Sequence, residues 1–272
     1  MSARIIAVAN QKGGVGKTTT CANLGFGLAR ENKRVLLVDF DPQASLSISM
    51  GIKKPGYIPV TINDILIKVM HNRPIADDEG ILHHPEGVDL IPSSVDLSTM
   101  QLNLMNHLSR ERVLCKYLNS LRSRYDFIIL DCAPSLELLA INAMTAADSV
   151  LIPVQVDFLA AKGMEAILQT IDQVRQSLNP ELEIEGILLT ISDLRTNHAR
   201  AVSTALRECY GERIRFFASD IPRSVRAAEL SVLGCSIYKH DPKGKVAAAY
   251  SSLTREVIRS DKERRRFQLD YA

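Results

Sequence analysis

A glycine-rich segment near the start of the chain joins an apolar strand pattern to a helical one. It reads Asn10-Gln11-Lys12-Gly13-Gly14-Val15-Gly16-Lys17-Thr18-Thr19. The glycines let backbone N–H groups turn inward around phosphate oxygens at a range that a Cβ atom would obstruct. In such a loop Lys17 reaches the β- and γ-phosphates, and the Thr18 hydroxyl binds Mg²⁺. The segment therefore predicts a nucleotide site at a strand-to-helix turn.

The loop departs from the usual pattern at its start, where Gln11 replaces a glycine and Lys12 follows it. A triphosphate carries more negative charge than one lysine and one Mg²⁺ neutralise. The second lysine therefore either completes the charge balance in its own subunit or reaches a nucleotide in another subunit. The residues alone leave both alternatives open. A dinucleotide-binding loop is disfavoured, because the pattern G-x-G-x-x-G starting at Gly14 would need a glycine at Thr19.

Short β-branched runs alternate with helical periodicity along all 272 residues. This alternation predicts an α/β fold with a doubly wound, mostly parallel sheet and helices on both faces. The expected strands are Ile5–Ala9, Val35–Val38, Val88–Ile91, Phe127–Leu130, Val150–Val154, Ile187–Ile191 and Phe216–Ala218. The expected helices are Lys17–Arg30, Ser109–Ser123, Leu136–Ala146, Lys162–Ser177, His198–Tyr210 and Lys245–Arg259. Residues 50–86 contain four prolines around one short helical pattern, Ile62–His71, and are expected to form an insertion over the sheet.

Composition places the chain among ordinary globular proteins, with 46% apolar and 24% charged residues. The first residues lead directly into a strand pattern rather than into the apolar region of a signal peptide, so we expect a cytosolic location. The five cysteines show no C-x-x-C pairing, which favours reduced, buried thiols.

Positive charge is concentrated in two segments, although the net charge is only +2. Residues 195–226 contain seven arginines against three acidic residues, and residues 255–266 contain six basic against three acidic residues. Any role in nucleic-acid binding must therefore come from a local patch. Solvated helix faces are the alternative explanation for both segments.

Carboxylates follow two of the apolar strand patterns. Asp39 and Asp41 follow Val35–Val38, and Asp131 follows Phe127–Leu130. Ligands bind beyond the carboxyl ends of parallel strands, and a carboxylate on a buried strand needs a cation. Asp131 is therefore expected in the Mg²⁺ shell. Residues two apart in a strand share a face, so Asp39 and Asp41 are expected to act together on an Mg²⁺-bound or attacking water.

These motifs together resemble the deviant-Walker ATPases of the ParA/MinD group. Further segments match the chromosome-partitioning ParA/Soj branch in order and spacing: Pro153-Val154-Gln155, Leu188-Leu189-Thr190, Arg195-Thr196-Asn197, residues 221–226 and residues 241–245. The resemblance covers all but about the last dozen residues. It implies a single-domain P-loop NTPase fold over residues 1–260, followed by a basic C-terminal tail at 261–272.

The resemblance also implies roles for individual residues. Lys12 would contact the nucleotide of the opposite subunit in an ATP-bound homodimer, and Asp41 would activate or position the hydrolytic water. Asp39 and Asp131 would lie in the outer Mg²⁺ shell, with Thr18 binding the ion. The expected nucleotide contacts are Lys12, Gly13, Gly14, Val15, Gly16, Lys17, Thr18 and Thr19, with Asp193 and Pro222 near adenine. Arg195 and Arg226 match positions implicated in non-specific DNA binding.

The implied activity is Mg²⁺-dependent hydrolysis of ATP to ADP and phosphate. The ATP-bound dimer would bind double-stranded DNA without sequence preference, and a ParB-like activator would stimulate hydrolysis and release it. The resulting cytoplasmic, nucleoid-associated protein would segregate a chromosome, plasmid or integrative element. A MinD-like membrane-associated ATPase is the alternative, but the tail has too few apolar residues for an amphipathic membrane helix. Relatives of the nitrogenase iron protein and of tyrosine autokinases are disfavoured by the scattered cysteines and by the single tyrosine near the C-terminus.

Overall fold

Parallel strands form the centre of the molecule. The computed structural model describes residues 2–157, 160–193 and 196–270. In this part of the chain one seven-stranded sheet has the strand order β3-β4-β2-β5-β1-β6-β7. The strands are β1 (Arg4–Val8), β2 (Val35–Phe40), β3 (Leu82–His83), β4 (Asp89–Ile91), β5 (Phe127–Cys132), β6 (Ser149–Gln155) and β7 (Glu183–Thr190). Every neighbouring pair is parallel except β3 and β4, so the predicted fold class is confirmed.

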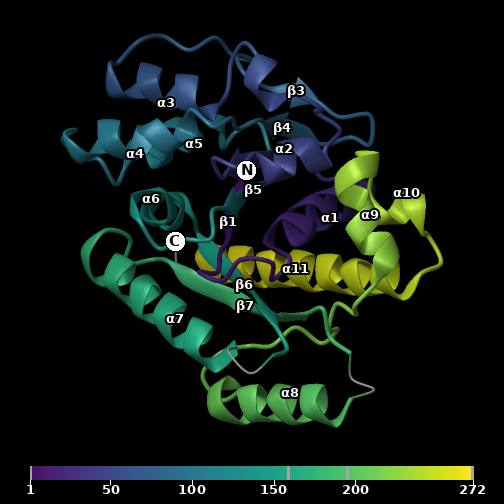
Figure 1. Ribbon diagram of the computed structural model, residues 1–272. Coiled ribbons are helices and arrows are strands. Elements are labelled where there is room, and N and C mark those ends of the chain that lie inside the picture. Colours follow the sequence, from purple (N-terminus) through teal and green to yellow (C-terminus); the bar gives the residue numbers. More distant parts are fainter. Residues whose placement is uncertain (1, 158–159, 194–195, 271–272) are drawn as a thin grey trace.

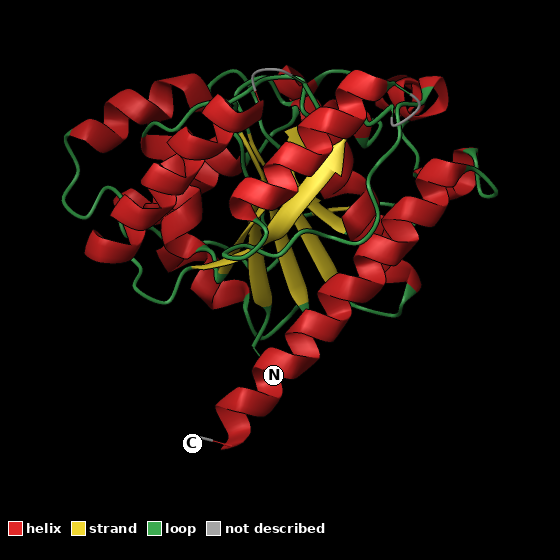
Figure 2. Ribbon diagram, turned by 90° about the horizontal axis from the view of Figure 1, so that it is seen from below, coloured by secondary structure: helices red, strands yellow, loops and turns green. Residues whose placement is uncertain are grey.

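Alternating side chains of the strands feed two separate hydrophobic cores. In β1, Ile5 and Ala7 belong to one core, whereas Ile6 and Val8 belong to the other. Successive side chains of a strand point to opposite faces of the sheet, so both faces must be covered. Figures 1 and 2 show helices on both sides of the sheet.

The helices divide between these two cores. The first core is covered by α3 (Ile62–Met70), α4 (Leu97–Met105), α5 (Val113–Leu121), α6 (Leu138–Ala146), α7 (Ala160–Ser177) and α8 (Asn197–Tyr210). The second is covered by α1 (Lys17–Arg30), α2 (Ser45–Ser49), α9 (Val225–Leu233), α10 (Ile237–His240) and α11 (Lys245–Asp270). A single turn of 3₁₀ helix, Pro55–Tyr57, precedes α3. No helix of the described residues is both long and apolar enough to cross a membrane.

Close packing of α1 against α11 depends on a glycine. A Cβ atom built on Gly27 would overlap the Thr254 hydroxyl and lie 2.7 Å from the Tyr238 hydroxyl. The two helices can therefore approach each other only because position 27 has no side chain. This contact fixes α11 beside the helix that follows the glycine-rich loop.

Three expectations about elements differ from the structure. Phe216–Ala218 is not a strand, because within this segment only Phe216 forms a bridge to β7. The Ala218 N–H instead donates to the Glu256 carboxylate of α11 at 3.2 Å. The short antiparallel edge strand β3 lies within the predicted insertion and was not expected. The predicted helix Lys245–Arg259 continues to Asp270, so the basic tail predicted from residue 261 is helical up to Asp270. Figure 2 shows this end of α11 extending past the body of the molecule.

Candidate active site

The glycine-rich loop connects the end of β1 to the start of α1 with an open, inward-facing backbone. Gly14 and Gly16 have φ values of 73° and 83°, which favour glycine. A Cβ atom on Gly13 or Gly14 would meet no atom of the described chain within 4 Å, so the loop surrounds open space. Gly16 is the N-cap of α1, and no side chain caps the helix there. The first N–H groups of α1 therefore remain available to an anion.

Two buried polar residues, one at the start of the loop and one on β7, hold the loop in shape. Asn10 donates to the Pro153 carbonyl at 2.7 Å and accepts from the Lys12 N–H at 3.0 Å. The Thr190 hydroxyl donates to the Val15 carbonyl at 2.7 Å. No role for Asn10 was predicted from the sequence. The signal that could have found it is a polar residue directly after a fully apolar strand pattern.

Lys17 lies inside the loop and is 7% exposed. Its ammonium group donates to the Lys12 carbonyl at 3.0 Å. Burial lowers the pKa of Lys17, and the nearby Asp131 carboxylate partly opposes this shift. The lysine is therefore held at the base of the loop. A bound phosphate would favour the charged form of Lys17, which burial disfavours.

Asp39 and Asp131 lie side by side on β2 and β5, in direct register. Both side chains are buried. Asp39 accepts from the Ser47 N–H and hydroxyl, each at 2.7 Å, and from the Asp41 N–H at 3.3 Å. Asp131 is different, because neither of its carboxylate oxygens has a hydrogen-bond partner of good geometry among the described residues.

Both carboxylates resist ionisation in this environment. Burial raises the pKa of Asp39 to about 7, although the Ser47 hydrogen bonds oppose the shift. Burial and the adjacent Asp39 raise the pKa of Asp131 above its usual range, with the Thr18 hydroxyl opposing the shift. Two such carboxylates fit a divalent cation that supplies the missing positive charge. Mg²⁺ fits such a pair, because it is usually bound by one or two carboxylates and keeps waters and phosphate oxygens as its other ligands.

Asp41 lies one residue beyond the end of β2, and its backbone N–H donates to the Asp39 carboxylate at 3.3 Å. It is buried, and its carboxylate accepts from the Gln43 N–H at 2.9 Å. Asp41 also contributes a raising effect to the pKa of Asp39, which puts the two carboxylates within electrostatic range. The structure thus brings Asp41, Asp39, Asp131 and Lys17 into one site.

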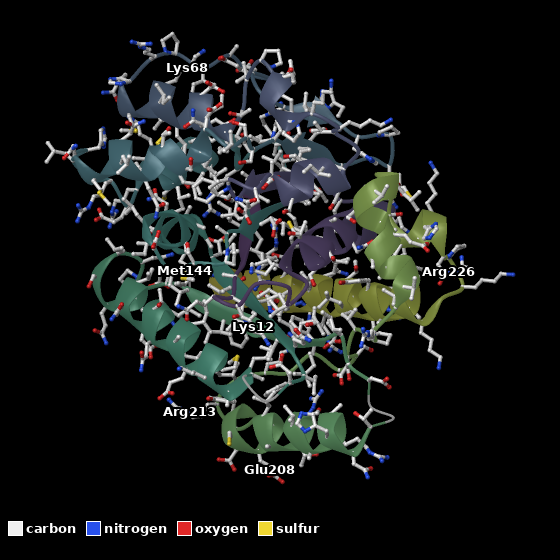
Figure 3. The ribbon with its side chains drawn as sticks, in the orientation of Figure 1. Lys12, Lys68, Met144, Glu208, Arg213 and Arg226 are labelled. Atoms are coloured by element: carbon white, nitrogen blue, oxygen red, sulfur yellow. The ribbon has the colours of Figure 1, made fainter. Side chains whose placement is uncertain are left out.

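Lys12 forms an ion pair with Asp157 of its own chain, just beyond the end of β6. Both side chains are 31% exposed. Figure 3 places Lys12 on the loop near the middle of the molecule. In this single chain the extra lysine is therefore bound in its own subunit.

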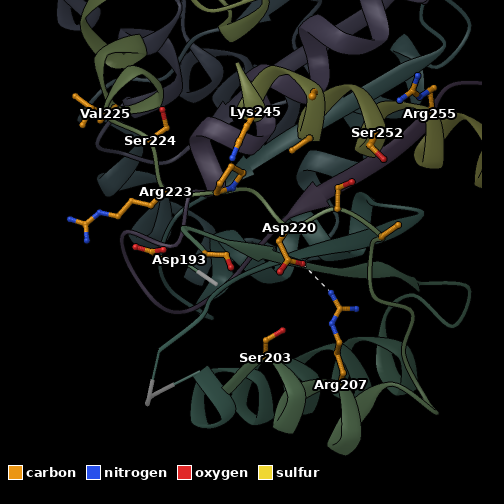
Figure 4. Close-up of a pocket in the computed structure, with 17 residues that line it drawn as sticks. Asp193, Ser203, Arg207, Asp220, Arg223, Ser224, Val225, Lys245, Ser252 and Arg255 are labelled. Carbon is orange, nitrogen blue, oxygen red and sulfur yellow. Dashed lines mark hydrogen bonds and ion pairs between the residues drawn. The ribbon is translucent and has the colours of Figure 1, made fainter. Parts of the chain in front are cut away.

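The segments predicted to contact adenine meet beside β7. Ser192 bridges to Pro222, and the Arg223 N–H donates to the Ser192 carbonyl at 3.2 Å. Asp193 and Pro222 both line a cavity of about 1500 Å³. Figure 4 shows Asp193 and Arg223 toward one end of this cavity and Arg255 toward the other.

The two residues predicted to bind DNA differ in what the structure describes. Arg226 lies in the first turn of α9, and its side chain is 59% exposed with its Nε 4.0 Å from Asp241. Figure 3 shows it on the outer side of the molecule, away from Lys12. Arg195 lies outside the described residues.

A contact between α2 and α9 joins the surroundings of Asp39 to those of Arg226. Ser47 of α2 binds Asp39 and also accepts from the Ser93 N–H at 3.0 Å. Just after α2, the backbone of Gly51 meets Gly234, the C-cap of α9. A Cβ atom on Gly234 would lie 2.6 Å from the Gly51 Cα. The two helices therefore touch backbone to backbone.

Comparison with known proteins places this arrangement in a family. Residues 3–184 match the family model described as an AAA domain. The chain is 42% identical over 260 residues to the chromosome partitioning protein ParA of Myxococcus xanthus, covering 95% of this chain and 89% of that protein. It is 40% identical over 259 residues to the sporulation initiation inhibitor protein Soj of Bacillus subtilis, covering 93% and 98% of the two chains.

A solved structure gives the same picture for the fold. A protein from Mycobacterium smegmatis, described as cobyrinic acid a,c-diamide synthase with bound ADP and magnesium, superposes with a TM-score of 0.83 and 35% identity, covering 96% of each chain. The fold, the glycine-rich loop and the sequence similarity over most of the chain all indicate the same family. The chain belongs to the ParA/Soj family of partitioning ATPases.

Proposed function

We propose that the protein hydrolyses ATP to ADP and phosphate with Mg²⁺, dimerises when ATP is bound, and binds double-stranded DNA without sequence preference. One observation carries the proposal: an open glycine loop with two lysines faces a buried carboxylate pair, and in the described residues neither Asp131 oxygen has a hydrogen-bond partner of good geometry. ADP and magnesium in the similar M. smegmatis protein support the choice of ligands.

Each group of the site then has a defined task. The loop N–H groups of Gly13–Gly16 and the N-terminus of α1, with Thr19, would hold the phosphates. Lys17 would bind the β- and γ-phosphates, where its charge stabilises the leaving group. Thr18, Asp39 and Asp131 would hold Mg²⁺, which neutralises phosphate charge. Asp193 and Pro222 would contact adenine at the cavity beside β7.

Asp41 is the residue that would act on water. Its carboxylate lies beyond β2, where it can accept a hydrogen bond from a water and orient it toward the γ-phosphorus. The water oxygen would bond to the γ-phosphorus as the bond from that phosphorus to the β–γ bridging oxygen breaks, so ADP would leave and the water protons would pass to the phosphate product and to solvent. Lys12 would add positive charge from the opposite subunit, so the site would be complete only in the dimer.

Dimerisation would also assemble the DNA-binding surface. Arg195 and Arg226 would each occur twice in a two-fold dimer, which widens the basic surface. A ParB-like activator would stimulate hydrolysis and return the protein to the DNA-free state in the cytoplasm. Repetition of this cycle on the nucleoid would position a chromosome, plasmid or integrative element.

The test compares ATP-dependent binding to plasmid DNA with binding to anionic liposomes. We expect binding to DNA with ATP, weak binding with ADP, and no binding to liposomes under either condition. Lys17→Ala is the matched control, because it should remove the nucleotide response without changing the outer surface. Liposome binding in place of DNA binding would favour the MinD-like alternative and overturn the proposal.

A further inference from the structure

From its middle to near its end, α11 carries four basic side chains on one face at helical spacing. Arg255, Arg259, Lys262 and Arg266 recur every three or four residues, so they lie along one face of the helix. All four are exposed. We call these four residues the α11 stripe.

The charges of the α11 stripe are not neutralised by neighbouring side chains. In the described part of the chain none of the four residues forms an ion pair, whereas the nearby acidic residues are occupied. Glu256 pairs with Arg215, and Asp261 pairs with Arg265. Only Glu263 adds an exposed negative charge within this stretch. The four cations of the stripe together with Glu263 therefore present a net charge of +3 to solvent.

The orientation of the α11 stripe is fixed by the other side of the helix. Tyr250, Leu253 and Val257 are fully buried in the core that α11 shares with α1. Gly27 allows the close approach described above, so the helix has little freedom to roll. The stripe therefore presents a defined surface, and its far end projects past the body of the molecule (Figure 2).

The same helix face continues into the large cavity. Lys245, Ala248 and Ser252 precede Arg255 at the same spacing, and all four line the cavity. The α11 stripe thus begins at the end of the cavity opposite Asp193 (Figure 4) and runs outward from it. It is separate from Arg226, which lies near Asp241 before the start of α11.

We propose that the α11 stripe is a second DNA-binding surface, which contacts phosphates of a bound duplex. This inference rests on the proposed function. From Arg255 to Arg266 the helix rises about 16 Å, which corresponds to about five base-pair steps of B-DNA. Unpaired arginines and a lysine suit phosphate contacts, which position a duplex without reading its sequence.

An anionic membrane fits the α11 stripe less well than DNA. Membrane-binding helices place apolar side chains beside the basic ones. Between residues 255 and 267, Phe267 is the only exposed large apolar side chain, whereas Val257 is buried in the core. The surface thus offers charge without the apolar area that insertion requires.

The test measures the affinity of the ATP-bound protein for random-sequence duplex DNA over a range of salt concentrations. The variant is Arg259→Ala/Lys262→Ala/Arg266→Ala, which leaves Arg255 in the cavity wall and keeps helix-forming residues. Three lost phosphate contacts should reduce the slope of log affinity against log salt by about 2.7 per bound subunit. The loss of affinity should be largest at low salt.

Two controls make the result specific. Arg259→Lys/Arg266→Lys keeps the charges and should keep the salt slope. Lys53→Ala/Lys54→Ala/Arg73→Ala removes the same charge from exposed loops around α3. Because these residues are not proposed to contact phosphates, this variant should change the salt slope much less than the triple α11 variant does. Circular dichroism and ADP binding check that each variant is folded.

The outcomes separate this inference from the function on which it rests. If the triple α11 variant keeps the wild-type affinity and slope while Arg226→Glu loses DNA binding, the α11 stripe is not a DNA surface and the proposed function stands. If the wild-type protein itself does not bind DNA with ATP, the proposed function fails. If the triple variant loses only liposome binding, the stripe contacts membranes instead and the inference is wrong.

Discussion

The extra lysine of the nucleotide loop, Lys12, is bound to Asp157 of its own chain rather than left free to reach outward. Both side chains are about one-third exposed, so the ion pair is partly screened by solvent. An exposed pair of this kind stabilises by about 0.2–1 kcal/mol. Lys12 can therefore exchange Asp157 for a phosphate at low cost, which suits a lysine that changes partner on dimerisation.

Lys12→Ala should weaken ATP-dependent dimerisation more than it weakens ADP binding by the monomer, because the ammonium group is proposed to act across the interface. Asp157→Asn is the matched variant and should strengthen dimerisation by no more than about fivefold, the equivalent of 1 kcal/mol. Sedimentation with ATP measures both. A Lys12→Ala protein that dimerises normally but loses ADP affinity would show that Lys12 acts within its own subunit.

Lys17→Ala and Asp41→Ala should have opposite effects on the amount of ATP-bound protein. Loss of Lys17 removes the buried cation at the base of the loop, so nucleotide binding should disappear. Loss of Asp41 removes the carboxylate that orients water, so ATP should bind and the dimer should persist because hydrolysis stops. Nucleotide titration and phosphate release distinguish the two. Wild-type hydrolysis by Asp41→Ala would disprove the role assigned to Asp41.

Asp131→Asn should stabilise the nucleotide-free protein while impairing its response to Mg²⁺. The side chain is buried without a good partner, and removing its charge should raise the free energy of unfolding by about 1–3 kcal/mol. Because its folded pKa is raised, the native state holds this proton more tightly than the unfolded state does, and the penalty grows as pH rises. Chemical denaturation should therefore show a larger gain at pH 8 than at pH 5. An equal gain at both pH values would mean that charge is not the cause.

Charge reversal at Arg226 should abolish ATP-dependent DNA binding and leave nucleotide binding intact, and we expect the same for Arg195. Neutralising one phosphate contact per subunit should lower the salt slope by roughly two per dimer. Filter binding at several salt concentrations measures this change. An Arg195→Glu/Arg226→Glu protein with wild-type dimerisation, DNA affinity and salt slope would remove these residues from the interface.

Gly27→Ala should destabilise the fold, because the added methyl group would overlap Thr254 and crowd Tyr238. Overpacking of this kind costs about 1–3 kcal/mol. Gly56→Ala is the control, since its Cβ atom would meet no described atom within 4 Å. Thermal unfolding of the two variants should therefore separate clearly, and equal stability would show that α1 and α11 can move apart.

The parts of the fold that the sequence predicted well are those in which local pattern and burial agree. The helix Lys17–Arg30 was predicted with its observed bounds, and most strands were predicted within a few residues. Phe216–Ala218 has a strand-like composition, but α11 supplies the partner for its backbone, and only the tertiary structure shows this. The short helices α2, α4 and α9 were not predicted, because each has only five to nine residues and weak periodicity.

The candidate site was predictable where motif chemistry fixes the residue. Lys17, Asp39 and Asp131 lie close together, and their roles at a nucleotide stay a prediction. Partners supplied from distant segments were not predictable: Asn10 is fixed by Pro153, and Lys12 by Asp157. These contacts depend on how β1 and β6 lie beside each other, which a local sequence pattern does not encode.

The contact of Gly51 with Gly234 connects the proposed nucleotide site around Asp39 to the helix that carries Arg226. Asp39 holds Ser47, α2 ends against the C-cap of α9, and α9 begins with the turn that carries Arg226. Neither glycine has a side chain that could absorb a shift by changing rotamer. If Arg226 binds DNA as proposed and nucleotide binding displaces α2, the displacement would reach the helix that carries Arg226. Linkage then requires DNA to change the affinity for nucleotide by the same factor.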